Sequence, residues 1–472
     1  MSISSLGVGS GLDAETIITK LMTLERQPIN NLQTLQDGMK TQLSAIGSLQ
    51  SLLSTMQDKA RALTSLTLWG QTTATSSDST VASASTSTGA ATGSYQVTVQ
   101  NLAKAQTVTS AAQNSAQSTL SEGTLTIDLG TWGGPDGFVP KDGSSPVSIT
   151  IGPGDTSLAA IRDKINAAGA GVSATIVNDA NGARLSLRST ETGAENGFRI
   201  TATEAVDDGS DITGLSILGY DEDATSTPMQ FNQAAENARA LINGIDVESS
   251  TNTLEKVADG LTLTLSKVSA SPVQITVAND TASVKSAITD FVTAFNALSS
   301  TLQSNLKYDS GSQKAGPLQG DRAAVSLQWA LRGVINTPSS ASSAFSVLSE
   351  IGIAMKQDGT LATTGSKLDA ALQNPAELKK LLVTNGDTNA SSGFIQRFAN
   401  LASAMLDNEG AIELRQTSLE AAIKRNQKDQ DAYEDRLTLT EKRLRAQYEA
   451  LDTKMATLST LANYVSQQFG SG

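Results

Sequence analysis

The sequence of 472 residues contains no cysteine and no histidine. Without cysteine the chain can form neither disulfides nor thiolate metal sites. Without histidine it lacks the commonest general base and the commonest zinc ligand. A catalytic site would then need a pair of carboxylates, and no such pair stands out in the sequence. We therefore predict that the protein is not an enzyme and that it uses no metal ion or cofactor.

Positive charge is in the minority, since 34 Lys and Arg residues stand against 47 Asp and Glu residues for a formal net charge of -13. Affinity for nucleic acids and for anionic membranes depends on clustered cations. We therefore expect no nucleic-acid partner. No stretch approaches the ~20 consecutive apolar residues of a membrane span, so we also expect no membrane insertion.

The first residues, Met1 to Gly11, lack the charged start and the apolar run of a cleavable signal peptide. Export would therefore need a route that reads an uncleaved N-terminus. The segment Gly7-Val-Gly-Ser-Gly11 follows no strand and precedes no Lys-Ser or Lys-Thr pair, so we predict a flexible segment and no phosphate-binding loop. The acid-rich stretch at 200–238 lacks the spacing of a calcium loop and is interpreted as solvated surface.

What the sequence does have is heptad spacing at both ends. In the N-terminal part, a short helical face precedes Pro28, which should end or kink the helix. Two seven-residue series then run from 32 to 63, broken by Gln42, and predict a long helix with a narrow packing seam. The N-terminal leg residues are Leu12, Ile17, Leu21 and Leu24. The stem helix seam consists of Leu32, Leu35, Met39, Ile46, Leu49, Leu53 and Met56.

The C-terminal helix has the clearest pattern. Apolar residues follow two seven-residue series from 437 to 469, over a length of roughly 50 Å at ~1.5 Å per residue. A single small core cannot hide so long a seam, so we predict contacts with other subunits. The predicted oligomer and filament contacts are Leu437, Leu444, Tyr448, Leu451, Met455, Leu458, Val465 and Phe469.

The middle of the chain is β-rich. Between Gln71 and Ser94, 14 of 24 residues are Ser or Thr, which indicates a linker into a β region. Alternating strand patterns follow to about residue 280, and one helix is predicted at 158–167. The predicted strands are 95–99, 124–127, 147–151, 172–177, 184–187, 198–201, 261–265 and 273–277.

Helical periodicity returns at Val284. Further helices are predicted at 322–335, at 369–382 and from 394 to about 430. A hairpin turn is predicted at Asp358-Gly359.

These patterns predict an α+β multidomain fold in which the two ends pair as an antiparallel helical stalk. We expect terminal leg helices at 1–42 with 433–472, and a helical stem at 43–78 with 281–432. A β-rich head with antiparallel sheets is expected at 79–280. The head should hold two domains, the second inserted at about 121–236.

Short motifs lie along the chain from one end to the other. The N-terminal ones are Leu6-Gly-Val-Gly-Ser-Gly-Leu-Asp13 and Glu25-Arg-Gln-Pro28. The C-terminal ones are Leu444-Arg445, Gln447-Tyr448, Leu451-Asp452 and Gln467-Gln-Phe469. Between them lie Ile242-Asn-Gly244, Gly316-Pro-Leu-Gln-Gly-Asp321 and Ile351-Gly-Ile353. In this order the motifs resemble the flagellar filament cap protein family (FliD, hook-associated protein 2). Ile242-Asn-Gly244 resembles the family's central motif, part of which flagellins share, and the two motifs after it resemble its helical-domain signature.

The resemblance implies a secreted structural subunit at the distal tip of the bacterial flagellum, where it promotes folding and insertion of flagellin and blocks flagellin loss. It implies a homo-oligomeric ring, of roughly four to six copies, with flagellin and the hook-filament junction protein as partners. It also implies an export chaperone on the C-terminal helix and export by the flagellar type III route. Two alternatives remain open: another axial subunit of the filament or junction, and a tip adhesin that binds host glycans.

Overall fold

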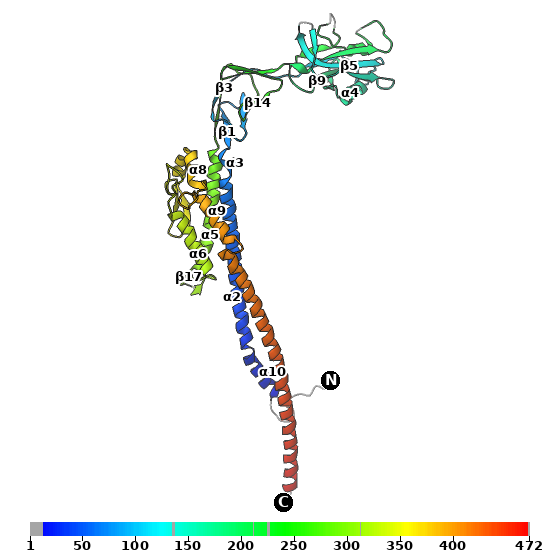
Figure 1. The fold of residues 1–472 in the computed structure, drawn as a ribbon. Coiled ribbons are helices and arrows are strands. Elements are labelled where there is room, and N and C mark those ends of the chain that lie inside the picture. The colour runs from blue at the N-terminus through cyan, green and yellow to red at the C-terminus, as the bar shows by residue number, and fades with distance from the viewer. Residues whose placement is uncertain (1–12, 135–136, 211, 224–226, 312, 471–472) are drawn as a thin grey trace. The chain divides into compact units, whose positions relative to one another are not determined.

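The computed structural model describes residues 13–134, 137–210, 212–223, 227–311 and 313–470 (Figure 1). The chain divides into two compact units, residues 1–69 with 281–472 (the helical unit) and residues 70–280 (the β unit). Long terminal helices and antiparallel sheets confirm the predicted fold class. The boundary predicted at 78/79 is wrong, because strand β1 (Thr72–Ser76) pairs with β16 (Val273–Asn279) inside the β unit.

The helical unit is built from long helices and two small hairpins. The helices are α1 (Ala14–Glu25), α2 (Gln27–Thr64), α3 (Leu66–Trp69), α5 (Thr281–Leu306), α6 (Arg322–Asn336), α7 (Gly365–Leu372), α8 (Pro375–Val383), α9 (Phe394–Leu406) and α10 (Ala411–Phe469). The hairpins are β17 (Tyr308–Asp309) with β18 (Lys314–Ala315), and β19 (Ile353–Met355) with β20 (Leu361–Thr363). The predicted turn at Asp358-Gly359 joins β19 to β20, with Gly359 at φ +76°.

One hydrophobic core holds this unit together. It contains the second half of α2, most of the apolar face of α5, and residues of α6 to α10. Phe398 of α9 packs against Phe291 and Phe295 of α5, with ring centroids 5.3 and 5.5 Å apart. The stem seam residues Ile46, Leu49, Leu53 and Met56 all lie in this core. The second half of the stem seam is therefore buried within its own chain.

Two helix predictions need correction. The helix predicted at 369–382 is two helices, because Pro375 begins α8 and cannot continue α7. The helix predicted from 394 to about 430 ends at Leu406, and α10 begins at Ala411 after Gly410. A Cβ on Gly410 would lie 2.4 Å from the carbonyl oxygen of Met405, so only glycine fits this turn. The C-terminal helix is consequently one element of 59 residues.

The β unit contains two hydrophobic cores. The first lies between a five-stranded sheet and a three-stranded sheet. Buried and exposed residues alternate along their strands, so each sheet buries one face. The five strands, in sheet order, are β1, β16, β3 (Gly93–Asn101), β12 (Ala238–Ile242) and β13 (Ile245–Ser249). The three strands are β14 (Thr253–Ala258), β15 (Leu261–Leu265) and β2 (Ala82–Thr86).

The second core packs helix α4 (Leu158–Ala167) with two four-stranded sheets and the 3-10 helix at Gly214–Leu218. One sheet holds β10 (Gly197–Glu204), β5 (Gly123–Gly134), β6 (Gly137–Pro140) and β7 (Val147–Ile151). The other holds β11 (Gln230–Gln233), β4 (Thr107–Thr109), β9 (Gly182–Ser189) and β8 (Val172–Asp179). The insertion expected at about 121–236 starts too late, because Val108 of β4 already belongs to this core.

Asparagine side chains fix two corners of the β unit. Asn243, at φ +50°, forms the β12–β13 turn with Gly244 and accepts a hydrogen bond from the backbone N–H of Gln96 at 2.8 Å. The amide of Asn252 bonds both backbone groups of Ala103, accepting from its N–H at 2.8 Å and donating to its carbonyl at 3.0 Å. These residues therefore act as substitute strand partners.

Replacing Asn252 with alanine should destabilise the β unit by about 1–3 kcal/mol, because the buried backbone groups of Ala103 lose their partners. Urea unfolding of the full chain, followed through Trp132 after replacing Trp69 and Trp329 with phenylalanine, measures this change. The exposed Asn178→Ala change in β8 serves as the control. Equal stability of the two variants would contradict the assignment.

Candidate interaction surface

The two ends of the chain meet as an antiparallel helix pair (Figure 1). Gln50 of α2 donates to Glu413 near the start of α10 at 2.8 Å, and Gln36 donates to Gln427 at 2.9 Å. The order along α2 is the reverse of the order along α10. The antiparallel pairing predicted from the heptads is thus present in the structure.

The first half of the predicted stem seam is only partly right. Leu32 and Met39 are half-buried against neighbouring helices, but Leu35 is 57% exposed. Gln36 occupies the buried position in its place. A straight helix repeats every 3.6 residues and drifts against a seven-residue count, so the second series was counted one residue out of phase here.

The helix break predicted near Pro28 is present. Helix α1 ends at Glu25, and Pro28 lies in the first turn of α2. Ala14 and Ile18 are its buried residues, whereas the predicted leg residues Ile17, Leu21 and Leu24 are exposed. Leu12 lies outside the described residues. The predicted leg face is therefore open to other molecules.

Arg445 ties α1 to α10. Its two terminal nitrogens each donate to a carboxylate oxygen of Glu15 at 2.8 Å, and its Nε donates to Glu441 at 3.0 Å. Hydrogen bonds from Arg445 lower the pKa of Glu15 below its ordinary value. Arg445 belongs to a C-terminal stretch that resembles the cap family, and Glu15 lies two residues after the N-terminal stretch that ends at Asp13.

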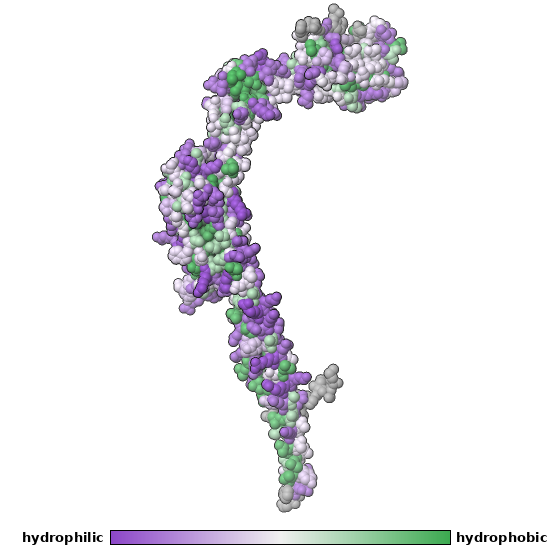
Figure 2. All heavy atoms as spheres, in the orientation of Figure 1, coloured by the Kyte–Doolittle hydropathy of each residue, from purple (hydrophilic) through white to green (hydrophobic). Residues whose placement is uncertain are grey.

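Beyond this ion pair, α10 presents an apolar face, and Figure 2 shows apolar residues along the C-terminal part of the helix. Leu444 and Tyr448 are half-buried, but the following apolar residues are exposed. We name this surface the terminal face. It consists of Leu451, Met455, Leu458, Leu461, Tyr464 and Val465.

Two predictions about this surface change. Leu437 is only 6% exposed and packs within its own chain, so its assignment to an intermolecular contact is wrong. Leu461 and Tyr464 are exposed on the terminal face although the seven-residue series passed over them. Both lie well to the side of that series at 3.6 residues per turn, and they are exposed because no described helix covers this part of α10. The side chain of Phe469 lies outside the described residues.

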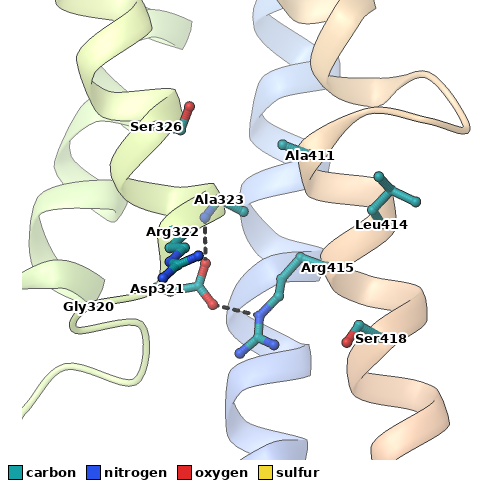
Figure 3. Close-up of a pocket in the computed structure, with 9 residues that line it drawn as sticks. All are labelled: Gly320, Asp321, Arg322, Ala323, Ser326, Ala411, Leu414, Arg415 and Ser418. Atoms are coloured by element: carbon teal, nitrogen blue, oxygen red, sulfur yellow. Dashed lines mark hydrogen bonds and ion pairs between the residues drawn. The ribbon is translucent and has the colours of Figure 1, made fainter.

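Asp321 joins the stem helices (Figure 3). Its carboxylate accepts from the N–H groups of Ala323 and Ala324 at 3.0 and 3.2 Å, capping α6, and accepts from Arg415 of α10 at 2.6 Å. Arg415 also reaches Gln42 of α2 at 3.4 Å. A pocket of about 550 Å³ lies beside this contact. The motif ending at Asp321 thus positions α6 against the α2–α10 pair.

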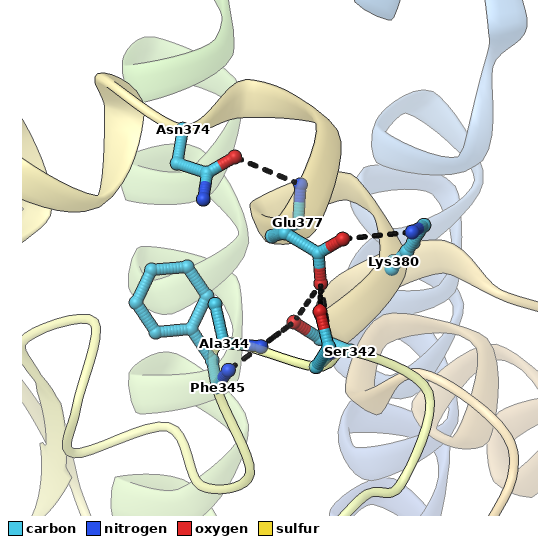
Figure 4. A network of polar contacts seen from close by, with 7 residues as sticks. Ser342, Ala344, Phe345, Asn374, Glu377 and Lys380 are labelled. Atoms are coloured by element: carbon cyan, nitrogen blue, oxygen red, sulfur yellow. Dashed lines mark hydrogen bonds and ion pairs between the residues drawn. The ribbon is translucent and has the colours of Figure 1, made fainter.

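A second polar network holds the irregular segment between α6 and β19 (Figure 4). Glu377 of α8 accepts from the hydroxyl of Ser342 at 2.7 Å, from the N–H of Ser343 at 2.7 Å and from Lys380 at 2.7 Å. Arg397, which is buried, donates to the carbonyls of Thr337 and Pro338 from the other side. The segment is therefore fixed by side chains of α8 and α9.

No cluster of three metal-ligating side chains occurs in the described residues. Among the same residues, no helix is long and apolar enough to cross a membrane.

Replacing Asp321 with alanine should destabilise the helical unit by about 2 kcal/mol, because α6 loses its cap and Arg415 its partner. Thermal unfolding measured by circular dichroism at 222 nm tests this change. Asp387→Ala, at an exposed loop position, should have almost no effect. The role of Asp321 fails if both variants unfold at the wild-type temperature.

Acid should loosen the segment at 339–350. Lys380, then Ser342 and Ser343, hold the pKa of Glu377 at about 2, below its ordinary 4.5. A lowered folded-state pKa gives stability that is present above 4.5 and is lost as the pH falls toward 2. Hydrogen exchange, corrected for intrinsic rates, should show protection of this segment falling between pH 5 and pH 2. Glu377→Gln should show weak protection at both pH values, and a wild-type profile in that variant would refute the role of the Glu377 carboxylate in holding this segment.

Comparisons with known proteins agree with this arrangement. Two family models match the chain, flagellar hook-associated protein 2 N-terminus at residues 10–106 and flagellar hook-associated protein 2 C-terminus at residues 235–460. The flagellar hook-associated protein 2 of Escherichia coli K12 is 34% identical, over 99% of this chain and 98% of that protein. The Salmonella typhimurium protein of the same name is 32% identical with the same coverage.

A third family model, the flagellin hook IN motif, matches residues 139–191. The motif shared with flagellins was predicted at Ile242-Asn-Gly244, and the match lies elsewhere. The matched stretch includes Ile165-Asn166 of α4. The Asn166 amide bonds the N–H of Ala174 at 2.7 Å and its carbonyl at 2.9 Å, which fixes α4 to β8.

The fold agrees with a crystal structure of the flagellar cap protein FliD D1-D2-D3 domains from Escherichia coli. The TM-score is 0.57 at 33% identity, over 80% of this chain and 99% of that chain. Identity above 30% across nearly the whole length places the chain plainly: it belongs to the flagellar hook-associated protein 2 family of flagellar cap proteins.

Proposed function

We propose that the protein caps the distal tip of the bacterial flagellum as a ring of roughly four to six copies. The cap holds secreted flagellin, promotes its folding and insertion, and prevents its loss. The role is structural and involves no catalysis. The membership of the chain in the flagellar hook-associated protein 2 family supports this proposal.

The observation that carries the proposal is the terminal face of α10. Burying one large apolar side chain contributes roughly 1.5–3 kcal/mol, whereas an exposed helical ion pair contributes only ~0.2–0.5 kcal/mol. The strength of subunit assembly should therefore come from residues such as Leu458 and Leu461, each 58% exposed in the single chain. The exposed leg residues of α1 add to the same contacts.

The same surface explains the remaining partners of the proposal. An apolar helix face needs cover before assembly, which an export chaperone on α10 provides. After export by the flagellar type III route with an uncleaved N-terminus, the ring contacts and the hook-filament junction protein replace the chaperone. The family assignment favours a cap over another axial subunit.

Replacing Leu458 and Leu461 together with lysine should leave the chain monomeric, because lysine keeps the helix but removes the apolar contact. The mass of the purified full chain, measured by light scattering, tests ring formation. In cells that carry the variant, flagellin should accumulate in the medium as monomer.

The matched control is Ser459→Lys with Ser466→Lys, which adds the same charge at exposed polar positions of the same helix. This control should form rings and retain flagellin. The proposal would be refuted if the wild-type chain stayed monomeric at high concentration, or if the variant with lysine at Leu458 and Leu461 still formed rings.

A further inference from the structure

A pocket of about 490 Å³ lies within the helical unit, between α6, α9 and the loop that precedes α9. Its lining includes Arg397 of α9, which is only 3% exposed. Asn389 and Asn400 also line it, and both are exposed to solvent. The pocket therefore opens beside the two asparagines and has a buried arginine at its base. We name it the arginine pocket.

The guanidinium of Arg397 has one hydrogen-bond donor to spare. Its four hydrogen bonds all go to backbone carbonyls, those of Ser392 at 3.0 Å, Thr337 at 2.7 Å, Pro338 at 3.1 Å and Ala390 at 3.3 Å. An arginine has five N–H groups. One N–H of Nη1 is thus left without an acceptor among the described residues.

The positive charge of Arg397 has no negative counterpart. No carboxylate in the described part of the chain forms an ion pair with it. Its carbonyl partners and the ring of Phe394, 4.8 Å from the guanidinium carbon, contribute partial charges only. Burial lowers the pKa of Arg397 below its ordinary value. Because a buried cation is costly without an anion, an anionic ligand gains more here than at an exposed arginine.

The rest of the lining offers a second donor and an apolar wall. The Oδ1 atom of Asn400 accepts from Gln396 at 3.0 Å, which leaves the amino group of Asn400 as a donor. The remaining side chains are small or apolar and include Ala330, Val334 and Leu401. Donors at one end and apolar carbon atoms elsewhere are suited to an anionic group attached to an apolar body.

The walls of the arginine pocket are tied together within the chain itself. The N–H of Ser340 donates to the carbonyl of Ala390 at 2.8 Å, and the hydroxyl of Ser339 donates to the carbonyl of Ser392 at 2.9 Å. Arg397 bonds the same two carbonyls. The guanidinium is therefore held in place before any ligand arrives, and a preformed pocket loses little conformational freedom on binding.

From the unpaired buried cation and the shape of its surroundings, we infer that the arginine pocket binds a small monocarboxylate with an apolar body. The carboxylate accepts from the spare N–H of Arg397 and from the amino group of Asn400, and the apolar body lies against Val334 and Leu401. The inference goes beyond the proposed cap, because the site lies within one chain and needs neither a ring nor flagellin.

Isothermal titration calorimetry of the full chain at pH 7 tests the inference with pentanoate, its neutral isostere pentanamide, and inorganic phosphate. Pentanoate should bind about tenfold more tightly than pentanamide, because only the acid forms charge-assisted hydrogen bonds. Phosphate should bind more weakly than pentanoate, because it has no apolar body. Equal affinities of pentanoate and pentanamide would overturn the inference.

A pair of glycine variants checks that binding occurs in this pocket. Gly333 of α6 lines the pocket and has open space beside its Cα, so Gly333→Leu should fill the pocket, keep the helix and abolish pentanoate binding. The matched control is Gly38→Leu, which makes the same change at an exposed glycine of α2 with equal space. The control should bind pentanoate as the wild type does. Unchanged binding by Gly333→Leu would refute the site. Neither variant removes Arg397, whose loss could unfold the segments that it joins.

The carboxylate can come from a free acid or from the C-terminus of a peptide, and a further titration separates these sources. Acetyl-alanyl-valine with a free carboxylate should bind more tightly than its C-terminal amide. Tighter binding of this peptide than of pentanoate would assign the pocket to a peptide C-terminus, and the reverse order would assign it to a free acid. If neither acid bound better than its amide, the inference would fail. Ring formation is measured by mass, so the cap and the pocket can fail independently.

Discussion

The antiparallel pairing of α2 and α10 is the contact on which the helical unit depends. Gln50 meets Glu413 at the start of α10, and Glu15 meets Arg445 far along it. Helices α1 and α2 together therefore cover α10 only as far as about residue 448. Because α10 continues to Phe469, its last turns extend beyond every described helix that could cover them (Figure 1). The exposed apolar face follows from this difference in length.

This geometry separates two kinds of surface on one helix. Near the middle of α10, one side is buried on α2 through polar residues such as Gln430, and the opposite side carries charge. Toward the C-terminus the side chains become large and apolar. Apolar burial is strong and insensitive to salt, while exposed charges are weak and salt-dependent. One continuous helix thus carries two exposed surfaces of different physical character.

Much of the fold could be predicted from the sequence, because period and turn chemistry are local signals. The helix at Leu158–Ala167 and the strands Val147–Ile151 and Leu261–Leu265 have the predicted bounds. Strands such as β1 and β2 were missed because Thr, Ser and Ala fill them, with little contrast between their two faces. The stem seam failed at its second residue, Leu35, because the phase of a straight helix drifts over several turns.

The candidate surface was harder to predict than the fold. The sequence identified an apolar C-terminal seam but could not tell which residues the chain covers by itself. Leu437 and Leu458 look alike in the heptad, but Leu437 lies beside helices of its own chain, whereas Leu458 lies beyond Arg445, the residue that pairs with Glu15 near the start of α1. The polar anchors Asp321 and Arg415 are distant in sequence, so their pairing becomes visible only once α6 and α10 are packed.

The distance in sequence between the paired ends also has a consequence for folding. The bond between Gln36 and Gln427 closes a loop with a sequence separation of 391 residues, and the bond between Glu15 and Arg445 closes one of 430. Closing so long a loop is entropically costly, so contacts inside each unit should form first. The β unit lies within this loop and is itself compact, which shortens the effective loop that α2 and α10 must close. Until that closure, the facing apolar residues of both helices stay uncovered, and a chain exported unfolded would need them protected at this stage above all others.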